Sequence, residues 1–168
     1  MTLIVTVAQC TSRELNELLA QRELAIAVGE GRLQGAPAAA ALFAGWCVLL
    51  SDAILVLDTP MVWAGVTWRF GENAWSLWLS GVREIDANSA LEAGLCDAVI
   101  PPGKNADEWV GEWIGTRSEL ALDSAAALIG RRGGDALERA EFARLFAAGE
   151  PQEGLRAFLG KRSARWQR

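Results

Sequence analysis

The side chains that most often carry out enzyme chemistry are scarce in this sequence. Its 168 residues include no histidine, which excludes Ser-His-Asp triads, histidine-based acid–base catalysis and the usual zinc sites. The three cysteines, Cys10, Cys47 and Cys96, lack a C-x-x-C spacing, so we expect free thiols and no metal ion. Glu30 and Asp52 fall in turns, where we expect solvated carboxylates rather than catalytic ones.

The charge balance limits the partners of the chain. A net charge of -5 with 51% apolar residues predicts a globular protein and argues against nucleic acid as a partner. Basic residues gather at the C-terminal end, "GKRSARWQR", where they could attract an anion locally. The start, "MTLIVTVA", has no basic n-region, so we expect no secretory signal and a cytoplasmic location.

One segment, residues 36–50, has no polar side chain. A membrane-spanning helix needs about 20 apolar residues. This segment is shorter and contains Pro37 and Gly45. We therefore expect a buried Ala-rich helix followed by a strand at Trp46–Leu50, and no membrane span.

The first half of the sequence alternates between strand and helix signals. Strands are predicted at residues 3–8, 24–28, 46–50 and 53–57. Thr11 and Glu14 form a capping box that begins a helix, and its buried face should comprise Leu15, Leu18 and Leu19, with Arg22 as its basic end. This alternation favours an α/β fold with a mainly parallel sheet.

The second half of the sequence is expected to be helical. An apolar stripe at Trp109, Val110, Trp113 and Ile114 predicts one amphipathic helix. Asp135 and Glu138 repeat the capping-box pattern ahead of a helix lined by three apolar residues, Phe142, Leu145 and Phe146. A last helix near residues 152–161 should bury Leu155, Phe158 and Leu159.

Residues 85–103, "IDANSALEAGLCDAVIPPG", predict an N-capped helix that ends at Gly94 and leads into an apolar strand. Their wording resembles the "ID-A-x-x-A-x-x-x-GL-V-D-x-V-x-P" segment of the crotonase (enoyl-CoA hydratase/isomerase) superfamily. The closing "ERAEFARLFAAGEPQEGLRAFLGKRSARW" is similar to the end of that family, and "PMVWAGV" and "IAVGEGRLQGAPAAAALFAGWCVLLSDA" are looser matches.

The resemblance implies an architecture. We expect an α/β, crotonase-like (ClpP/crotonase) fold with an abridged ββα-type spiral core and a C-terminal helical oligomerisation region. One crotonase-like domain should cover residues 1–168, with the core at 1–103 and the helices at 104–168. The chain would be an N-terminally trimmed and divergent member, assembling as a homotrimer or hexamer, possibly with a larger crotonase partner.

The resemblance also implies a site for an acyl-CoA. The family binds the thioester oxygen between two backbone N–H groups. The turn that supplies the second donor corresponds to Gly35 and Ala36, followed by Pro37, which has no N–H. The glutamate pair of the hydratases falls on Ala39 and Met61, which cannot transfer protons. Trp46 replaces a structural aspartate of the family.

Other residues could replace the missing acids. Some relatives place their acid after the "PE" turn, where this chain has Arg69, Glu72 and Asn73. Glu72 is the best remaining proton carrier; alternatively it caps a helix at residues 74–79. Three tryptophans, Trp63, Trp68 and Trp75, could wall an acyl pocket or belong to the core.

For CoA, the family uses an aromatic residue and a lysine that correspond to Phe158 and Lys161, although a core Phe and a solvated Lys are equally compatible with the sequence. No cofactor is expected beyond the CoA thioester as substrate or ligand. Two functions remain open. One is an acyl-CoA isomerase, lyase or decarboxylase, and the other is a non-catalytic crotonase-like scaffold or partner subunit. A membrane-anchored protein is a distant third.

Overall fold

The computed structural model describes residues 3–20, 25–130 and 134–166 and contains two compact units. The α/β unit comprises residues 3–20 and 25–106, and the helical unit comprises residues 107–166. The boundary lies close to residues 103 and 104, where the sequence predicts the change from core to helices. Whether the two units form one domain stays a prediction.

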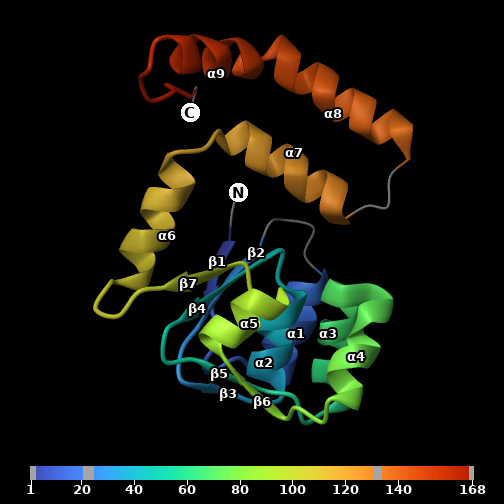
Figure 1. The fold of residues 1–168 in the computed structure, drawn as a ribbon. Coiled ribbons are helices and arrows are strands. Elements are labelled where there is room, and N and C mark those ends of the chain that lie inside the picture. The colour runs from blue at the N-terminus through green and yellow to red at the C-terminus, as the bar shows by residue number, and fades with distance from the viewer. Residues whose placement is uncertain (1–2, 21–24, 131–133, 167–168) are drawn as a thin grey trace. The chain divides into compact units, whose positions relative to one another are not determined.

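The main sheet of the α/β unit has four parallel strands in the order β1-β2-β4-β7 (Figure 1). They are β1 (Leu3–Thr6), β2 (Ala25–Gly29), β4 (Trp46–Leu50) and β7 (Ala98–Ile100). Every residue of β2 is buried, and β2 is an inner strand of this sheet, between β1 and β4. The predicted strands at residues 24–28 and 46–50 are confirmed, apart from Leu24, which lies outside the described residues.

A second sheet has the order β3-β5-β6. Its strands are β3 (Arg32–Leu33), β5 (Ile54–Val56) and β6 (Glu84–Asp86). The pair β3–β5 is parallel and the pair β5–β6 is antiparallel. Arg32 reaches Glu84 with two hydrogen bonds of 2.9 and 2.6 Å, which join the two outer strands across β5.

Helix α1 (Ser12–Ala20) begins with the predicted capping box. The Thr11 amide donates to Glu14 Oε2 at 2.8 Å, and the Glu14 amide donates to Thr11 Oγ1 at 3.3 Å. These bonds from Thr11 lower the pKa of Glu14. Leu15 and Leu18 are buried, but the expectation for Leu19 is wrong because this residue lies to one side of their stripe and is exposed. Arg22 lies outside the described residues.

Helices α2 (Ala36–Phe43) and α3 (Pro60–Phe70) pack closely against each other. A methyl group on Gly65 would lie 2.7 Å from Cβ of Leu42, so only glycine allows this approach. Residues 38–42 of α2 are fully buried. Within residues 3–20, 25–130 and 134–166, no helix has both the length and the apolarity needed to cross a membrane.

The chain continues through a 3-10 turn, η1 (Gly71–Asn73), into α4 (Ala74–Leu79) and then, after β6, into α5 (Ala87–Ala93). The N-cap and the ending of α5 are as predicted. The Asp86 carboxylate accepts from the amides of Asn88 and Ser89 at 3.0 Å, and Gly94 ends the helix at φ 77°, a conformation that favours glycine.

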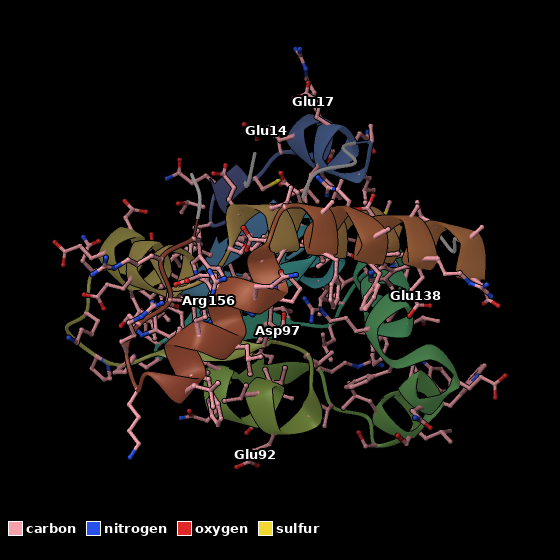
Figure 2. All side chains as sticks on the ribbon, turned by 90° about the horizontal axis from the view of Figure 1, so that it is seen from above. Glu14, Glu17, Glu92, Asp97, Glu138 and Arg156 are labelled. Carbon is pink, nitrogen blue, oxygen red and sulfur yellow. The ribbon has the colours of Figure 1, made fainter. Side chains whose placement is uncertain are left out.

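The helical unit consists of α6 (Ala106–Gly115), α7 (Glu119–Gly130), α8 (Asp135–Ala147) and α9 (Glu150–Leu159). The Ser124 hydroxyl of α7 donates to Glu141 of α8 at 2.8 Å and accepts from Arg144 at 2.7 Å. These bonds fix α7 against α8. Charged side chains such as Glu138 on α8, and Glu17 and Glu92 in the α/β unit, project outward (Figure 2).

Two expectations for the helical unit are wrong. Gly134 is the N-cap of α8, and no side chain caps this helix, so Asp135 lies within the first turn and pairs with Arg139 at 3.6 Å instead. The expectation that Leu155, Phe158 and Leu159 are buried is also wrong, and apolar residues of both α8 and α9 are exposed. Five are exposed, namely Phe142, Phe146, Leu155, Phe158 and Leu159.

Candidate functional site

The start of α2 presents a backbone donor. Gly35 precedes the helix with φ 62° and ψ -122°. Open space surrounds its Cα, so backbone conformation rather than crowding favours glycine there. Ala36, as the first helical residue, has no acceptor within the helix for its N–H, and Pro37 has no N–H at all. The N–H of Ala36 therefore lies at the positive end of the α2 dipole.

The start of α3 lies beside the start of α2. Gln34 Nε2, two residues before Ala36, donates to Asp58 Oδ2 at 2.5 Å. Asp58 immediately precedes Thr59, whose Oγ1 caps α3 by accepting from the Val62 amide at 3.3 Å. Two helix N-termini therefore lie close together, each with backbone N–H groups that could donate to a ligand oxygen, and the Asp58 carboxylate lies in the same region.

The positions that correspond to the family's glutamate pair also lie on these two helices. Ala39 is fully buried in α2, and Met61 is exposed in the first turn of α3. Neither side chain can take up or release a proton. No group of three or more His, Cys, Asp or Glu residues suited to a metal ion occurs in the described part of the chain.

A groove of about 620 Å³ runs from α3 to α4, and we call it the tryptophan groove. It is lined by Trp63, Thr67, Gly71, Glu72, Ala74, Trp75 and Trp78. The rings of Trp75 and Trp78 stand nearly perpendicular, at 85°, with their centroids 5.8 Å apart. Their side chains are 66% and 51% exposed, so Trp75 does not belong to the core.

The sequence analysis names two of the three tryptophans that line the groove as candidate pocket residues, and it misses the third. Trp63 and Trp75 line the groove as a pocket wall would, whereas Trp68 packs against Phe43 at a centroid distance of 6.4 Å. Trp78 was not among the candidates. Its spacing of three residues from Trp75, which brings two side chains to one face of a helix, was the signal that could have found it.

Glu72 is the acidic residue among those that line the tryptophan groove. It is exposed and lies in η1, one turn before α4. No side-chain hydrogen bond caps α4, whose N-cap is Asn73, so the structure gives no support to the capping interpretation of Glu72. No described residue forms an ion pair or hydrogen bond with its carboxylate.

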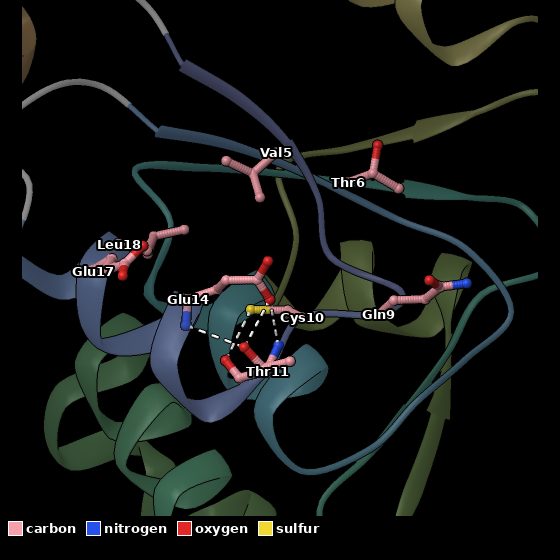
Figure 3. Close-up of a pocket in the computed structure, with 8 residues that line it drawn as sticks. All are labelled: Val5, Thr6, Gln9, Cys10, Thr11, Glu14, Glu17 and Leu18. Carbon is pink, nitrogen blue, oxygen red and sulfur yellow. Dashed lines mark hydrogen bonds between the residues drawn. The ribbon is translucent and has the colours of Figure 1, made fainter.

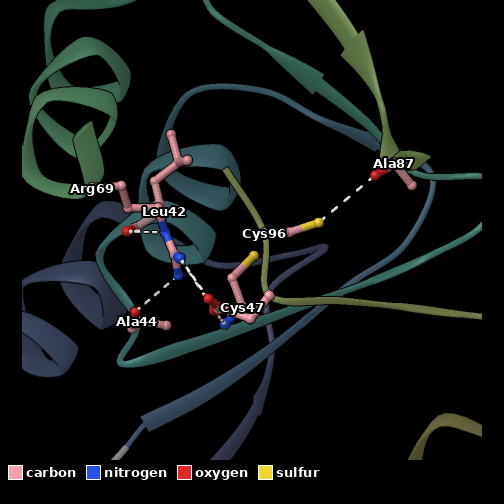
Figure 4. A network of polar contacts seen from close by, with 7 residues as sticks. Leu42, Ala44, Cys47, Arg69, Ala87 and Cys96 are labelled. Atoms are coloured by element: carbon pink, nitrogen blue, oxygen red, sulfur yellow. Dashed lines mark hydrogen bonds and ion pairs between the residues drawn. The ribbon is translucent and has the colours of Figure 1, made fainter. Parts of the chain in front are cut away.

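Arg69 has a structural role (Figure 4). Its Nε donates to the Leu42 carbonyl at 3.0 Å and its Nη2 to the Ala44 carbonyl at 3.2 Å, at the end of α2. Its Nη1 lies 3.1 Å from Asp97 Oδ2, which also accepts from the Cys47 amide at 2.7 Å. Since the Arg69 side chain is only 11% exposed and fully engaged, it is not available to a substrate.

The buried thiols beside this network are poor nucleophiles. Burial raises the pKa of Cys47 to about 12 and that of Cys96 to about 11. Cys96 Sγ donates a weak hydrogen bond to the Ala87 carbonyl at 3.7 Å (Figure 4). A thiol with a raised pKa is scarcely ionised near neutral pH, so neither cysteine is suited to nucleophilic catalysis.

A smaller pocket of about 360 Å³ lies between β1 and α1 (Figure 3). Cys10 and Glu14 line it together with Val5, Thr6, Gln9, Thr11, Glu17 and Leu18. Burial and the nearby Glu14 charge raise the pKa of Cys10, whose Sγ donates to the Thr11 carbonyl at 3.5 Å. The capping box occupies the Glu14 carboxylate, so this pocket offers no activated group.

The candidate CoA-binding residues lie at the end of α9 in the helical unit. Phe158 is 79% exposed, which excludes the alternative of a core residue. Lys161 is also exposed and has φ 48°, with its amide donating to the Phe158 carbonyl at 3.2 Å. The neighbouring Arg162 is engaged with Glu153 by hydrogen bonds of 2.7 and 3.1 Å.

The same unit holds a cavity of about 430 Å³ that the sequence did not indicate. Glu150, at the start of α9, lines it and is 8% exposed. Its Oε2 has no hydrogen-bond partner among the described residues. Arg117 also lines this cavity, but its guanidinium stacks on Trp113 at 3.3 Å and donates to the Trp113 carbonyl at 2.7 Å.

No protein-family model matches the sequence, and none of the curated proteins matches it significantly. Solved structures do match. An enoyl-CoA hydratase from Polaromonas sp. JS666 is 24% identical, with a TM-score of 0.70 over 92% of this chain and 66% of that one. An enoyl-CoA hydratase/isomerase from Marinobacter aquaeolei is 20% identical, with a TM-score of 0.64 over 92% and 64%. The chain has the crotonase fold.

The crotonase fold confirms the fold class that the motifs at residues 85–103 and at the C-terminal end predict. The chain spans slightly less than two thirds of the length of these two proteins. A structure described as an enoyl-CoA hydratase subunit from Geobacillus kaustophilus is covered to 80% of its length, at 20% identity and a TM-score of 0.69. The TM-scores establish the crotonase fold, and at identities of 20–24% they carry no statement about activity.

Proposed function

We propose that the chain is a divergent member of the crotonase superfamily that binds an acyl-CoA or a similar acyl thioester without the usual glutamate pair. The supporting observation is the start of α2, where Gly35 takes a positive φ and directs an N–H of Ala36 that has no helical acceptor. A thioester oxygen would accept from this N–H, next to the start of α3. By the resemblance, the exposed Phe158 and Lys161 of a neighbouring subunit would contact the adenine and phosphates of CoA.

If the protein is an enzyme, it is an isomerase, lyase or decarboxylase, and Glu72 is its proton carrier. One observation favours the second function, a non-catalytic partner subunit. Helix α3 has 11 residues and is therefore about 16 Å long. It separates Glu72, which follows its C-terminal end, from the region where Ala36 would hold the thioester. A proton carrier must come within hydrogen-bond reach of the reacting atom.

Thioester binding can be tested by removing one N–H. Ala36→Pro deletes the donor at a helix position that tolerates proline. We expect calorimetry to show an affinity for acyl-CoA at least about tenfold lower than in the parent protein, the loss of roughly one hydrogen bond to a charged or polarised acceptor. Pro37→Ala, the control, keeps the Ala36 N–H and should bind normally. Equal affinities in both variants would contradict the assignment of Ala36.

Glu72→Gln separates the enzyme from the partner subunit. It keeps the size of the side chain and removes the base, so turnover of a panel of acyl-CoA thioesters should fall roughly 100-fold or more with affinity little changed. Turnover that survives the substitution would contradict the catalytic role of Glu72. If both versions bind thioester and turn over none of the panel, the partner-subunit function is the one supported.

A further inference from the structure

We propose that the tryptophan groove binds an organic cation whose charge is spread over alkyl groups, with a quaternary ammonium group as the best fit. Trp75 and Trp78, three residues apart on α4, form two walls of the groove, and Trp63 of α3 forms a third. The proposal concerns a site in the α/β unit and does not depend on thioester binding.

The two α4 tryptophans form an open corner. Their rings are perpendicular at 85° and their centroids are 5.8 Å apart, so one ring stands on the face of the other. Both side chains line the groove and are largely exposed, at 66% and 51%. A cation in this corner would lie within about 6 Å of both ring centroids, the range in which the ring quadrupole attracts positive charge.

The charges around the groove favour a cation over a neutral ligand. Glu72 is among the lining residues, and no lysine or arginine is. No described group neutralises its carboxylate, and the closest basic residue in sequence, Arg69, is committed to Asp97 and to two carbonyls at the end of α2. A purely apolar ligand would desolvate this carboxylate without compensation, whereas a cation would compensate it.

The surface type narrows the class of cation. Indole faces attract a charge by their electrons and offer no hydrogen-bond acceptor, so they suit an alkylated ammonium group, which has few or no N–H groups to satisfy. A primary ammonium would have three N–H donors, and one carboxylate together with Thr67 would satisfy them only in part.

The test compares choline with 3,3-dimethyl-1-butanol, a neutral compound of the same shape. The probes are added to the full chain labelled with ¹⁵N at the tryptophan indoles, at constant ionic strength maintained with sodium chloride. We expect choline to shift the signals of Trp63, Trp75 and Trp78 in a saturable manner, and the neutral compound to bind about tenfold more weakly. Equal binding of both compounds, or no saturable shift with choline, would overturn the proposal.

Variants of the groove locate the site. Trp75→Leu and Glu72→Gln should each weaken choline binding about tenfold, because one removes a wall and the other the opposing charge. Trp68→Leu, the matched control, replaces an exposed tryptophan that does not line the groove and should bind as the parent does. Ala36→Pro, which removes the proposed thioester donor, should also bind choline normally. A failure of the thioester proposal can therefore be told apart from a failure of the choline proposal. If Trp68→Leu weakens binding as much as Trp75→Leu, the groove is not the site.

Discussion

Arg69 and Glu72 lie three residues apart, yet the structure gives them different environments. Arg69 is mostly shielded from water and belongs to a network that joins the end of α2 to β4 and to the residue before β7. Its positive charge lies at the negative end of the α2 dipole, where two carbonyls accept from it. Glu72 faces the tryptophan groove.

Removing Arg69 should destabilise the protein strongly. Arg69→Ala leaves Asp97 and two carbonyls without their donor, and we expect the free energy of unfolding to fall by about 3 kcal/mol in a urea titration. Arg13→Ala is the control, since Arg13 forms an exposed pair with Glu17 on α1 and should change stability by no more than about 0.5 kcal/mol. Similar losses in both variants would contradict the structural role of Arg69.

The sequence names Glu72 as the best proton carrier but could not show that Arg69 is unavailable to a substrate. Arg69 lies in the last turn of α3 and Glu72 follows that helix, so the local pattern places both charges in the same region. The residue that decides is Asp97, 28 positions later, whose carboxylate reaches Arg69 only in the folded chain. Ala39 and Met61, in contrast, exclude a carboxylate pair at those positions by residue type alone.

At the scale of helices and strands, the sequence predicts those elements that carry a local signal, such as a capping residue or a run of apolar residues. The capping box at Thr11 and Glu14, the Asp86 cap and the buried runs of β2 and β4 are all confirmed. Strands β3 and β6 have two and three residues, too few to show an alternation, and they exist because β5 pairs with both. The exposure of the apolar face of α9 was not predicted, because an apolar stripe indicates that a helix face is covered but does not tell whether its own chain or another chain covers it.

The contact between α2 and α3 should not tolerate a larger residue. In Gly65→Ala the new methyl group would overlap Cβ of Leu42, which is attached to the backbone and cannot rotate away, so the helices must separate. We expect a loss of about 1–3 kcal/mol in thermal or urea unfolding. The control, Gly111→Ala in α6, meets no atom within 4 Å and should leave stability unchanged or raise it by up to about 1 kcal/mol. A neutral Gly65→Ala would contradict the close packing of α2 against α3.

The C-terminal tail should detach from α9 in acid. Hydrogen bonds from the Arg162 side chain and the Arg165 amide lower the pKa of Glu153 to about 2. Because this pKa is lowered on folding, the contacts contribute stability above about pH 4.5 and lose it as the pH falls toward 2. The indole signal of Trp166, which donates to the Thr116 carbonyl at 3.0 Å, should move over that range. Glu153→Gln should show the shifted Trp166 signal already at pH 7, whereas the control Glu112→Gln should not. A Trp166 signal of the parent protein that stays constant down to pH 2 would contradict the role of Glu153 in holding the tail.

On the scale of the whole molecule, exposed apolar side chains predict assembly. Leu155, Phe158 and Leu159, at i, i+3 and i+4, present an exposed apolar face on α9, and exposed apolar patches often mark interaction sites. We expect sedimentation at micromolar concentration to give a homotrimer or hexamer. Leu155→Glu with Leu159→Glu should give smaller species, whereas Leu79→Glu, at an exposed position of α4, should not. A parent protein that sediments as a monomer would contradict the prediction.

The position of Asp97 also has a consequence for synthesis on the ribosome. Strands β1, β2 and β4 are complete once residue 50 has been made, but β4 pairs with β7 and the Cys47 amide pairs with Asp97. Residues 51–100, up to the end of β7, take roughly 2.5–10 s to translate at about 5–20 residues per second. During that time the nascent sheet has an open edge at β4, and Arg69, once synthesised, lacks its ion-pair partner Asp97. We infer that the α/β unit cannot close before Asp97 leaves the exit tunnel, so a pause in translation before that codon prolongs exposure of the β4 edge to other chains.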